Sequence, residues 1–92
     1  MVRSTPSILA IDQGTTGTTC LVVANDGRIL GKGYEELPQY FPRPGWVEHD
    51  ATEIWEVTKR VAREALESTK LADVRGVGIT NQRETIVLWD RE

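Results

Sequence analysis

The chain opens with short apolar runs that turn-forming residues separate. Four consecutive apolar residues at 8–11 are typical of a strand that is buried on both faces of a sheet. A run rich in β-branched residues at 18–24 predicts a second strand. Asn-Asp-Gly at 25–27 predicts a tight hairpin turn after it, because Asp-Gly supplies the positive φ angles that such a turn needs. The chain is therefore expected to begin as an antiparallel meander.

A third strand of this meander is expected at 28–35, followed by a long connection. Gly31 and Gly33 weaken the strand pattern and indicate a bulge or a close neighbour. The connection at 37–50 has no periodicity and contains all but one of the four prolines. It forms an ordered loop if its aromatic rings pack down, since such rings rarely stay fully solvated; they are Tyr40, Phe41 and Trp46.

A helix is predicted to begin after Asp50 and to run to about Lys70. Asp50 is a good N-cap, and Glu53 three residues later completes a capping-box pattern. Glu56 and Arg60 are spaced for an ion pair on the outer side of this helix. Apolar residues repeat at helical spacing along the segment, at Ile54, Val57, Val61 and Ala65.

Two further strands are expected, at 74–80 and at 84–89. A meander followed by a helical crossover gives a mixed sheet with at least one face covered, so the fold class is α/β. The second of these strands runs to the last residues without a cap or a closing helix. We therefore expect the chain to be a piece of a longer domain that is cut at a loop.

Composition and charge limit the function classes. Ninety-two residues make one small domain, and 39% hydrophobic with 27% charged residues is typical of a soluble globular chain. The net charge of −3 gives no basic face for nucleic acid or an anionic membrane. No apolar run approaches the ~20 residues that span a bilayer, and residues 1–6 lack the apolar region expected of a secretion signal. One cysteine suits a reducing compartment, so a cytoplasmic protein is expected.

The turn at 12–17 carries the first chemical signal. Its two glycines, Gly14 and Gly17, let the backbone approach a ligand, and successive N–H groups can converge on an anion. Thr15 and Thr16 add hydroxyl donors for phosphate oxygens, and Asp12 can bind a hydrated Mg²⁺. The alternative is a hairpin whose Asp and Thr side chains satisfy turn amides. The turn is neither a Walker A loop nor a Rossmann fingerprint.

A second polar segment follows the strand at 74–80. Ligands in α/β sheets tend to lie beyond the carboxyl ends of strands, which is where Arg83 and Glu84 occur. An Arg fork donates to hydroxyls and a Glu carboxylate accepts from them, so the pair matches a small polyol. The alternative is an ordinary surface ion pair without a function.

The loop at 44–50 contains two further candidates. Trp46 can line a pocket, but a Trp after Pro-Gly more often fixes a loop to the core. His49 can act as a base, but a single His before a helix cap is more often a structural hydrogen-bond donor.

Three segments, in this order, resemble the FGGY carbohydrate kinases, which belong to the actin-like ATPase class. Ala-Ile-Asp-Gln-Gly-Thr-Thr at 10–16 resembles the phosphate turn of that family. Pro-Gly-Trp-Val-Glu-His-Asp at 44–50, with Glu-Ile-Trp at 53–55, is similar to a segment shared across it. Gly-Ile-Thr-Asn-Gln-Arg-Glu-Thr at 78–85 is similar to the version found in members that phosphorylate glycerol. The resemblance covers 8–90, nearly the whole chain.

This resemblance implies the N-terminal part of a ribonuclease-H-like domain that faces a second similar domain. Nucleotide would bind at the turn, through Thr15 and Thr16 with Gly14 and Gly17 around them, and Asp12 would assist Mg²⁺. Arg83 and Glu84 would bind glycerol. The cofactors implied are ATP and Mg²⁺, the partners glycerol and ATP or ADP, and the full-length protein is expected to be a homo-oligomer.

The sequence departs from the family pattern at one position. Glycerol-phosphorylating members often carry an Arg that reaches the nucleotide phosphates where this chain has Thr19. The family's catalytic base, an Asp, and its adenine pocket lie further downstream, so the chain alone is expected to be inactive. The alternatives are a kinase for another sugar or polyol, and a non-catalytic nucleotide-binding module of the same fold.

Overall fold

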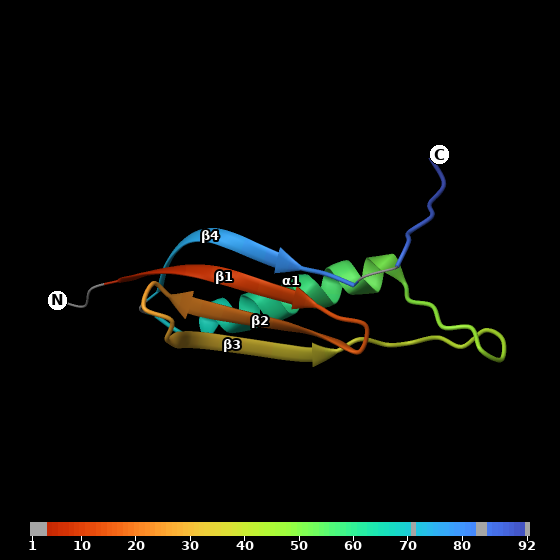
Figure 1. The fold of residues 1–92 in the computed structure, drawn as a ribbon, viewed down its shortest axis with the longest axis horizontal. Coiled ribbons are helices and arrows are strands. Elements are labelled where there is room, and N and C mark those ends of the chain that lie inside the picture. Colours follow the sequence, from red (N-terminus) through yellow and green to blue (C-terminus); the bar gives the residue numbers. More distant parts are fainter. Residues whose placement is uncertain (1–3, 71, 83–84, 92) are drawn as a thin grey trace.

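The computed structural model describes residues 4–70, 72–82 and 85–91, and within them the chain forms one four-stranded sheet and one helix (Figure 1). The spatial order of the strands is β3-β2-β1-β4. β1 pairs antiparallel with β2, β2 antiparallel with β3, and β4 parallel with β1. This is the predicted meander, crossover and mixed sheet. The elements are β1 (Thr5–Gln13), β2 (Gly17–Ala24), β3 (Ile29–Glu36), α1 (Ala51–Glu67) and β4 (Ala72–Thr80).

The hairpin turn between β2 and β3 forms as its sequence predicts. Gly27 adopts a φ of 92°, in the left-handed region that glycine enters without strain. Its N–H donates to the carbonyl of Ala24 at 2.9 Å, and the Asp26 carboxylate accepts from the backbone N–H of Arg28 at 3.1 Å. The turn therefore fixes the register of the two strands that it joins.

The helix begins at its predicted cap. The Asp50 carboxylate accepts from the backbone N–H groups of Thr52, at 2.8 Å, and of Glu53, at 3.3 Å. Only half of the capping box forms, because the Glu53 carboxylate accepts from the Tyr40 hydroxyl. The loop is thereby joined to the first turn of α1.

The helix ends at Glu67, three residues before the predicted end at Lys70. Ser68 caps it, and its hydroxyl donates to the Ala65 carbonyl at 2.7 Å while accepting from the Lys32 backbone N–H at 3.2 Å. The Ser68 hydroxyl thus takes a helix carbonyl that a further backbone N–H would otherwise bond, and it connects the helix end to β3.

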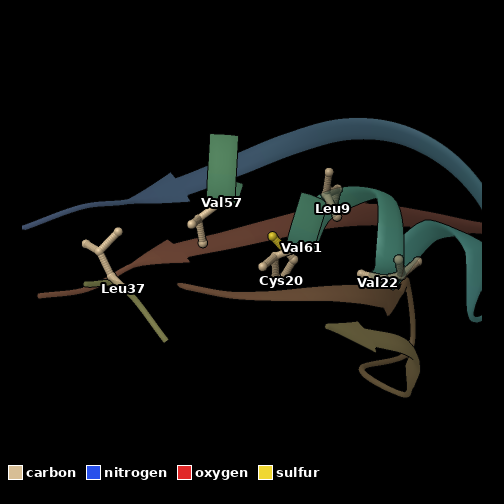
Figure 2. Close-up of a cluster of buried hydrophobic side chains, with 7 residues drawn as sticks. Leu9, Cys20, Val22, Leu37, Val57 and Val61 are labelled. Carbon is tan, nitrogen blue, oxygen red and sulfur yellow. The ribbon is translucent and has the colours of Figure 1, made fainter. Parts of the chain in front are cut away.

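The core lies between α1 and the sheet (Figure 2). The helix packs on β3, β2 and β1 and approaches β3 most closely at two glycines. A Cβ added at Gly31 would lie 2.4 Å from the Ala65 carbonyl oxygen, and one at Gly33 would lie 2.6 Å from that of Val61. The predicted close neighbour is therefore the helix, and the sheet register also shifts between Val22 and Val23. The buried cluster comprises Leu9, Cys20, Val22, Leu37, Val57, Val61 and Ala65.

Two packing predictions are wrong. β1 is not buried on both faces: Ile8 is 47% exposed, because α1 covers one face of the sheet. Arg60 does not pair with Glu56. It reaches across to Glu35 of β3, donating to that carboxylate through Nε at 3.1 Å and also through Nη2. Glu56 instead pairs with Lys59 at 3.0 Å.

The long loop is ordered in a different way from the one expected. The rings of Tyr40, Phe41 and Trp46 are all exposed, so they do not pack onto the core. The backbones of Tyr40 and Glu48 instead exchange two hydrogen bonds of 2.8 and 2.9 Å, which close the loop on itself. Trp46 lies against the guanidinium of Arg43, with 5.0 Å from Cζ to the ring centroid.

The last predicted strand does not form over 85–89, and Glu84, its first predicted residue, lies outside the described residues. A strand needs a neighbour for its backbone hydrogen bonds, and in the described part of the chain no strand pairs with the outer edge of β4. Ile86, Leu88 and Trp89 are highly exposed.

Within the described ranges, no helix has the length and apolar character that crossing a membrane requires.

Candidate functional site

The predicted site segments meet at one end of the sheet. β1 and β4 are parallel neighbours, so their carboxyl ends lie at the same edge, with Asp12 beside Thr80. Figure 1 shows the β1–β2 turn, the end of β4 and the start of α1 at this end of the molecule. Ligands of α/β sheets bind beyond strand carboxyl ends, so the topology assembles a candidate site here.

The β1–β2 turn is closed by its own backbone. The Gly14 N–H donates to the Gly17 carbonyl at 2.9 Å, so this amide is not free to bind an anion. Thr15 and Thr16 are exposed, and within the described ranges their hydroxyls make no hydrogen bond. The predicted alternative, in which these side chains satisfy turn amides, is therefore not what orders the turn.

Gly17 fits closely against a neighbouring aromatic ring. A Cβ at this position would lie 2.6 Å from the Tyr34 hydroxyl oxygen and 2.9 Å from the carbonyl oxygen of Glu35. A side chain at Gly17 would therefore displace β3 or the turn. The glycine sets the shape of the turn through packing.

The Asp12 carboxylate is exposed at the end of β1. Thr19 lies opposite Asp12 on the neighbouring strand β2. Asp12, Thr19 and Thr80 line an open cleft of about 360 Å³. In the described part of the chain, no three His, Cys, Asp or Glu side chains gather as a metal-binding group. Mg²⁺ usually takes one or two carboxylates and completes its shell with water and phosphate oxygens, and a single Asp fits that donor set.

A larger cleft of about 560 Å³ lies between the turn, the loop before α1 and the segment after β4. Gln82 and Thr85 line it and flank Arg83 and Glu84, the predicted polyol-binding pair, which lie outside the described residues. Glu48 supplies the carboxylate of the described lining, which contains no Lys or Arg. The remaining lining is Thr15, Gln39, Val47, His49, Ala51, Ile54, Ile86, Val87 and Leu88. These amide, hydroxyl and carboxylate groups can hydrogen-bond a hydroxylated ligand.

Gln82 connects this cleft to the turn. Its Nε2 donates to the Gly14 carbonyl at 3.2 Å, and its Oε1 accepts from the Thr85 hydroxyl at 2.9 Å. Gln82 lies within the segment at 78–85 but was not among the predicted site residues. The available signal was an amide side chain placed one residue before the predicted Arg83.

One ring nitrogen of His49 lacks, among the described residues, the partner expected of a structural donor. Its Nε2 is buried and, among the described residues, has no hydrogen-bond partner. An unpaired buried polar atom is costly, so this nitrogen is available to a group that enters the cleft.

Two pKa shifts bear on the chemistry near the site. Desolvation by burial raises the pKa of the Cys20 thiol, which disfavours the thiolate form. The hydrogen bond to Glu53, with burial and the nearby carboxylates of Glu53 and Asp50, raises the pKa of the Tyr40 phenol. Tyr40 therefore remains a neutral donor that fixes the loop.

The sequence is similar to a known family model and to curated proteins. Residues 7–92 match the model of the N-terminal domain of the FGGY family of carbohydrate kinases. Glycerol kinase of Rhodopirellula baltica is 50% identical over 90 residues, which is 96% of this chain and 17% of that protein. Glycerol kinase of Haloferax volcanii is 54% identical over 85 residues, 90% of this chain and 17% of its own length.

Solved structures share the fold. Plasmodium falciparum glycerol kinase with ADP has a TM-score of 0.84 and 30% identity, over 99% of this chain and 19% of that one. Xylulose kinase from Rhodospirillum rubrum has a TM-score of 0.87 and 23% identity, over 92% of this chain and 18% of that one. The likeness confirms the expected ribonuclease-H-like architecture. The chain spans 17–19% of the length of these glycerol kinases.

Proposed function

Because this chain belongs to the FGGY family of carbohydrate kinases, we propose that its residues 1–92 are the N-terminal part of a kinase that transfers phosphate from ATP to glycerol. The products would be glycerol 3-phosphate and ADP. The observation that carries the proposal is the meeting of the threonine turn and the segment after β4 at one sheet end, bridged by Gln82.

In this proposal the turn binds the nucleotide phosphates. Exposed hydroxyls of Thr15 and Thr16 donate to phosphate oxygens, while Gly14 and Gly17 keep the turn compact. Asp12 would hold a hydrated Mg²⁺, which neutralises phosphate charge when it is bound. Phosphoryl transfer depends mainly on positioning and on charge stabilisation, which such a turn supports.

The cleft beside the turn would accept glycerol. The Arg83 fork donates to two hydroxyls, and the Glu84 carboxylate accepts from one of them. The described lining adds amides and hydroxyls, which can hydrogen-bond the remaining hydroxyls of a polyol. The curated relatives at 50–54% identity are named glycerol kinases, and this supports glycerol over other polyols.

The 92-residue chain is proposed to be inactive by itself. The family resemblance places the catalytic base and the adenine pocket downstream of these residues. We also propose that the full-length protein is cytoplasmic and homo-oligomeric. Release of ADP that depends on glycerol, measured with the 92-residue chain alone, would contradict the first of these proposals.

A coupled ADP-release assay on the full-length protein tests the reaction, with glycerol and a pentulose as alternative substrates. Arg83→Ala is expected to raise the KM for glycerol far more than the KM for ATP. Arg75→Ala is the matched control, because Arg75 pairs with Asp73 near the other end of β4. Turnover on the pentulose alone would overturn glycerol as the substrate. Unchanged glycerol kinetics in Arg83→Ala would overturn the role of Arg83.

One observation favours a second function, a nucleotide-binding module without kinase activity. Thr19, an uncharged residue, lies opposite Asp12 where related kinases often carry an Arg that reaches the phosphates. A full-length protein that binds ATP but phosphorylates no polyol would establish this alternative.

A further inference from the structure

The side chain of Gln82 is fixed at both of its polar ends. Its Nε2 donates to the Gly14 carbonyl in the β1–β2 turn at 3.2 Å, and its Oε1 accepts from the Thr85 hydroxyl at 2.9 Å. The side chain is partly buried in the cleft between these two segments. It therefore joins two loops that are 68 residues apart in the sequence.

Gly14, the residue that Gln82 contacts, is hydrogen-bonded through both of its flanking peptide groups. The Gly14 carbonyl also accepts from Gln13 Nε2 at 2.8 Å, and the Gly14 N–H donates to the Gly17 carbonyl at 2.9 Å. A shift of Gly14 would disturb all three hydrogen bonds. Hydrogen-bond networks are one carrier of energetic coupling between sites.

We infer that Gln82 is a positioning residue that couples the phosphate turn to the polyol segment. This inference rests on the proposed function, in which the turn binds ATP and Arg83 binds glycerol. Because Gln82 directly precedes Arg83, a polyol that fixes Arg83 also fixes the Gln82 backbone. The Gln82 amide then orients the Gly14 carbonyl, and nucleotide bound at the turn acts back on Gln82 through the same hydrogen bond. Phosphoryl transfer needs the two substrates in line, so such coupling favours the productive arrangement.

The coupling is reciprocal by thermodynamic necessity, and this makes it measurable. The quantity is the ratio of the glycerol Kd without nucleotide to the Kd with a non-hydrolysable ATP analogue. In the full-length parent protein we expect this ratio to be about 5 or more, at the lower end of typical coupling between sites.

Gln82→Glu is the informative variant. It retains an oxygen that accepts from Thr85 but removes the donor to the Gly14 carbonyl. Gln13→Glu is the matched control, because it removes the other donor to the same carbonyl without touching the polyol segment. If the affinity ratio falls in Gln82→Glu merely because the turn becomes less rigid, it will fall equally in Gln13→Glu.

Isothermal titration of glycerol into the three full-length proteins, with and without the analogue, decides between these outcomes. We expect the affinity ratio to fall below about 2 in Gln82→Glu and to remain at the parent value in Gln13→Glu. A ratio that survives in Gln82→Glu, or that falls equally in both variants, would overturn the inference. So would a parent ratio near 1.

A second variant guards against a folding defect. Thr85→Val removes the bond to Gln82 Oε1 and leaves the Gly14 contact, so a partial loss of coupling is expected with an unchanged melting temperature. A parent protein that turns over no polyol would contradict the proposed function itself. A parent that turns over glycerol, with coupling intact in Gln82→Glu, would contradict the coupling alone.

Discussion

The side of the sheet beneath α1 and the β4 edge differ sharply in how they are packed. On the helix side, Val61 is fully buried and Gly33 lies in direct contact with the helix backbone. At the β4 edge, Val77 is 59% exposed, and a Cβ added at Gly78 would meet no atom within 4 Å. Both regions are built from apolar strands, so the difference comes from the position of α1 over β3, β2 and β1.

This contrast separates the part of the chain that stabilises the fold from the part proposed to bind ligands. Burial of apolar area beneath the helix supplies most of the favourable free energy. The sheet end near β4 has exposed hydroxyls, open clefts and an imidazole nitrogen with no hydrogen-bond partner in the part of the chain that the structure describes. Regions with few buried contacts open most readily, so substitutions at the β4 edge are expected to change binding more than stability.

The largest effect is expected for Gly33→Ala. Its new Cβ would lie 2.6 Å from the Val61 carbonyl oxygen and 3.2 Å from the Ala65 backbone nitrogen, so the helix must move away from β3. Overpacking against backbone of this kind costs about 3 kcal/mol. Urea unfolding of the 92-residue chain, followed by far-UV circular dichroism, measures the loss.

Gly78→Ala is the matched control, since Gly78 also lies in a strand and its surroundings are open. We expect it to be neutral or to stabilise the chain by up to about 1 kcal/mol, because alanine restricts the unfolded chain. Equal destabilisation by the two substitutions would contradict the claim that the helix alone distinguishes the two regions.

The next effect in size is a cavity beneath the helix. Val61→Ala removes two buried methyl groups, so the unfolding free energy should fall by about 2 kcal/mol. Val77→Ala removes the same atoms at the β4 edge, where most of the side chain already contacts water. A change of less than about 0.5 kcal/mol is expected there. A loss as large as that of Val61→Ala would show that the edge is packed in solution.

Much of this fold was predictable because local signals and tertiary packing agree. The Asp-Gly turn, the Asp50 cap and the helical spacing of Val57 and Val61 are each fixed by a few neighbouring residues. The errors occur where a distant partner decides. Arg60 turns to Glu35 because β3 lies within reach, and no spacing along the helix contains that information.

The candidate site was predictable in its location but not in its connections. Strand order places the Asp12 turn beside the end of β4, and the sequence supplied both segments. The hydrogen bond from Gln82 to Gly14 depends on how close the segment after β4 comes to the β1–β2 turn, which only the folded chain defines. The same holds for the unpaired Nε2 of His49, since burial of a single ring atom leaves no mark in the sequence.

A smaller effect is expected for the cap that starts the covering helix. Asp50→Ala leaves the backbone N–H groups of Thr52 and Glu53 without their acceptor, which should cost about 1 kcal/mol. Asp73→Ala is a suitable control, because that carboxylate lies in β4 and pairs with exposed Arg75. If the two variants unfold at the same urea concentration, the cap contributes nothing to the helix-covered side.

The smallest effect concerns the ion pair between Glu35 and Arg60, which joins α1 to β3 at the surface. The hydrogen bond from Arg60 and its positive charge lower the pKa of the Glu35 carboxyl, against an opposing contribution from burial. A carboxyl whose pKa is lower in the folded state contributes stability above its unfolded pKa and loses it as pH falls through the folded value. Glu35→Gln should therefore unfold slightly more easily than the parent at pH 7, and the difference should vanish in acid below the lowered pKa. Thermal unfolding from pH 7 down to pH 2, with Glu36→Gln as the neighbouring control, measures this. A difference that persists in acid would mean that Glu35 acts through packing rather than through its charge.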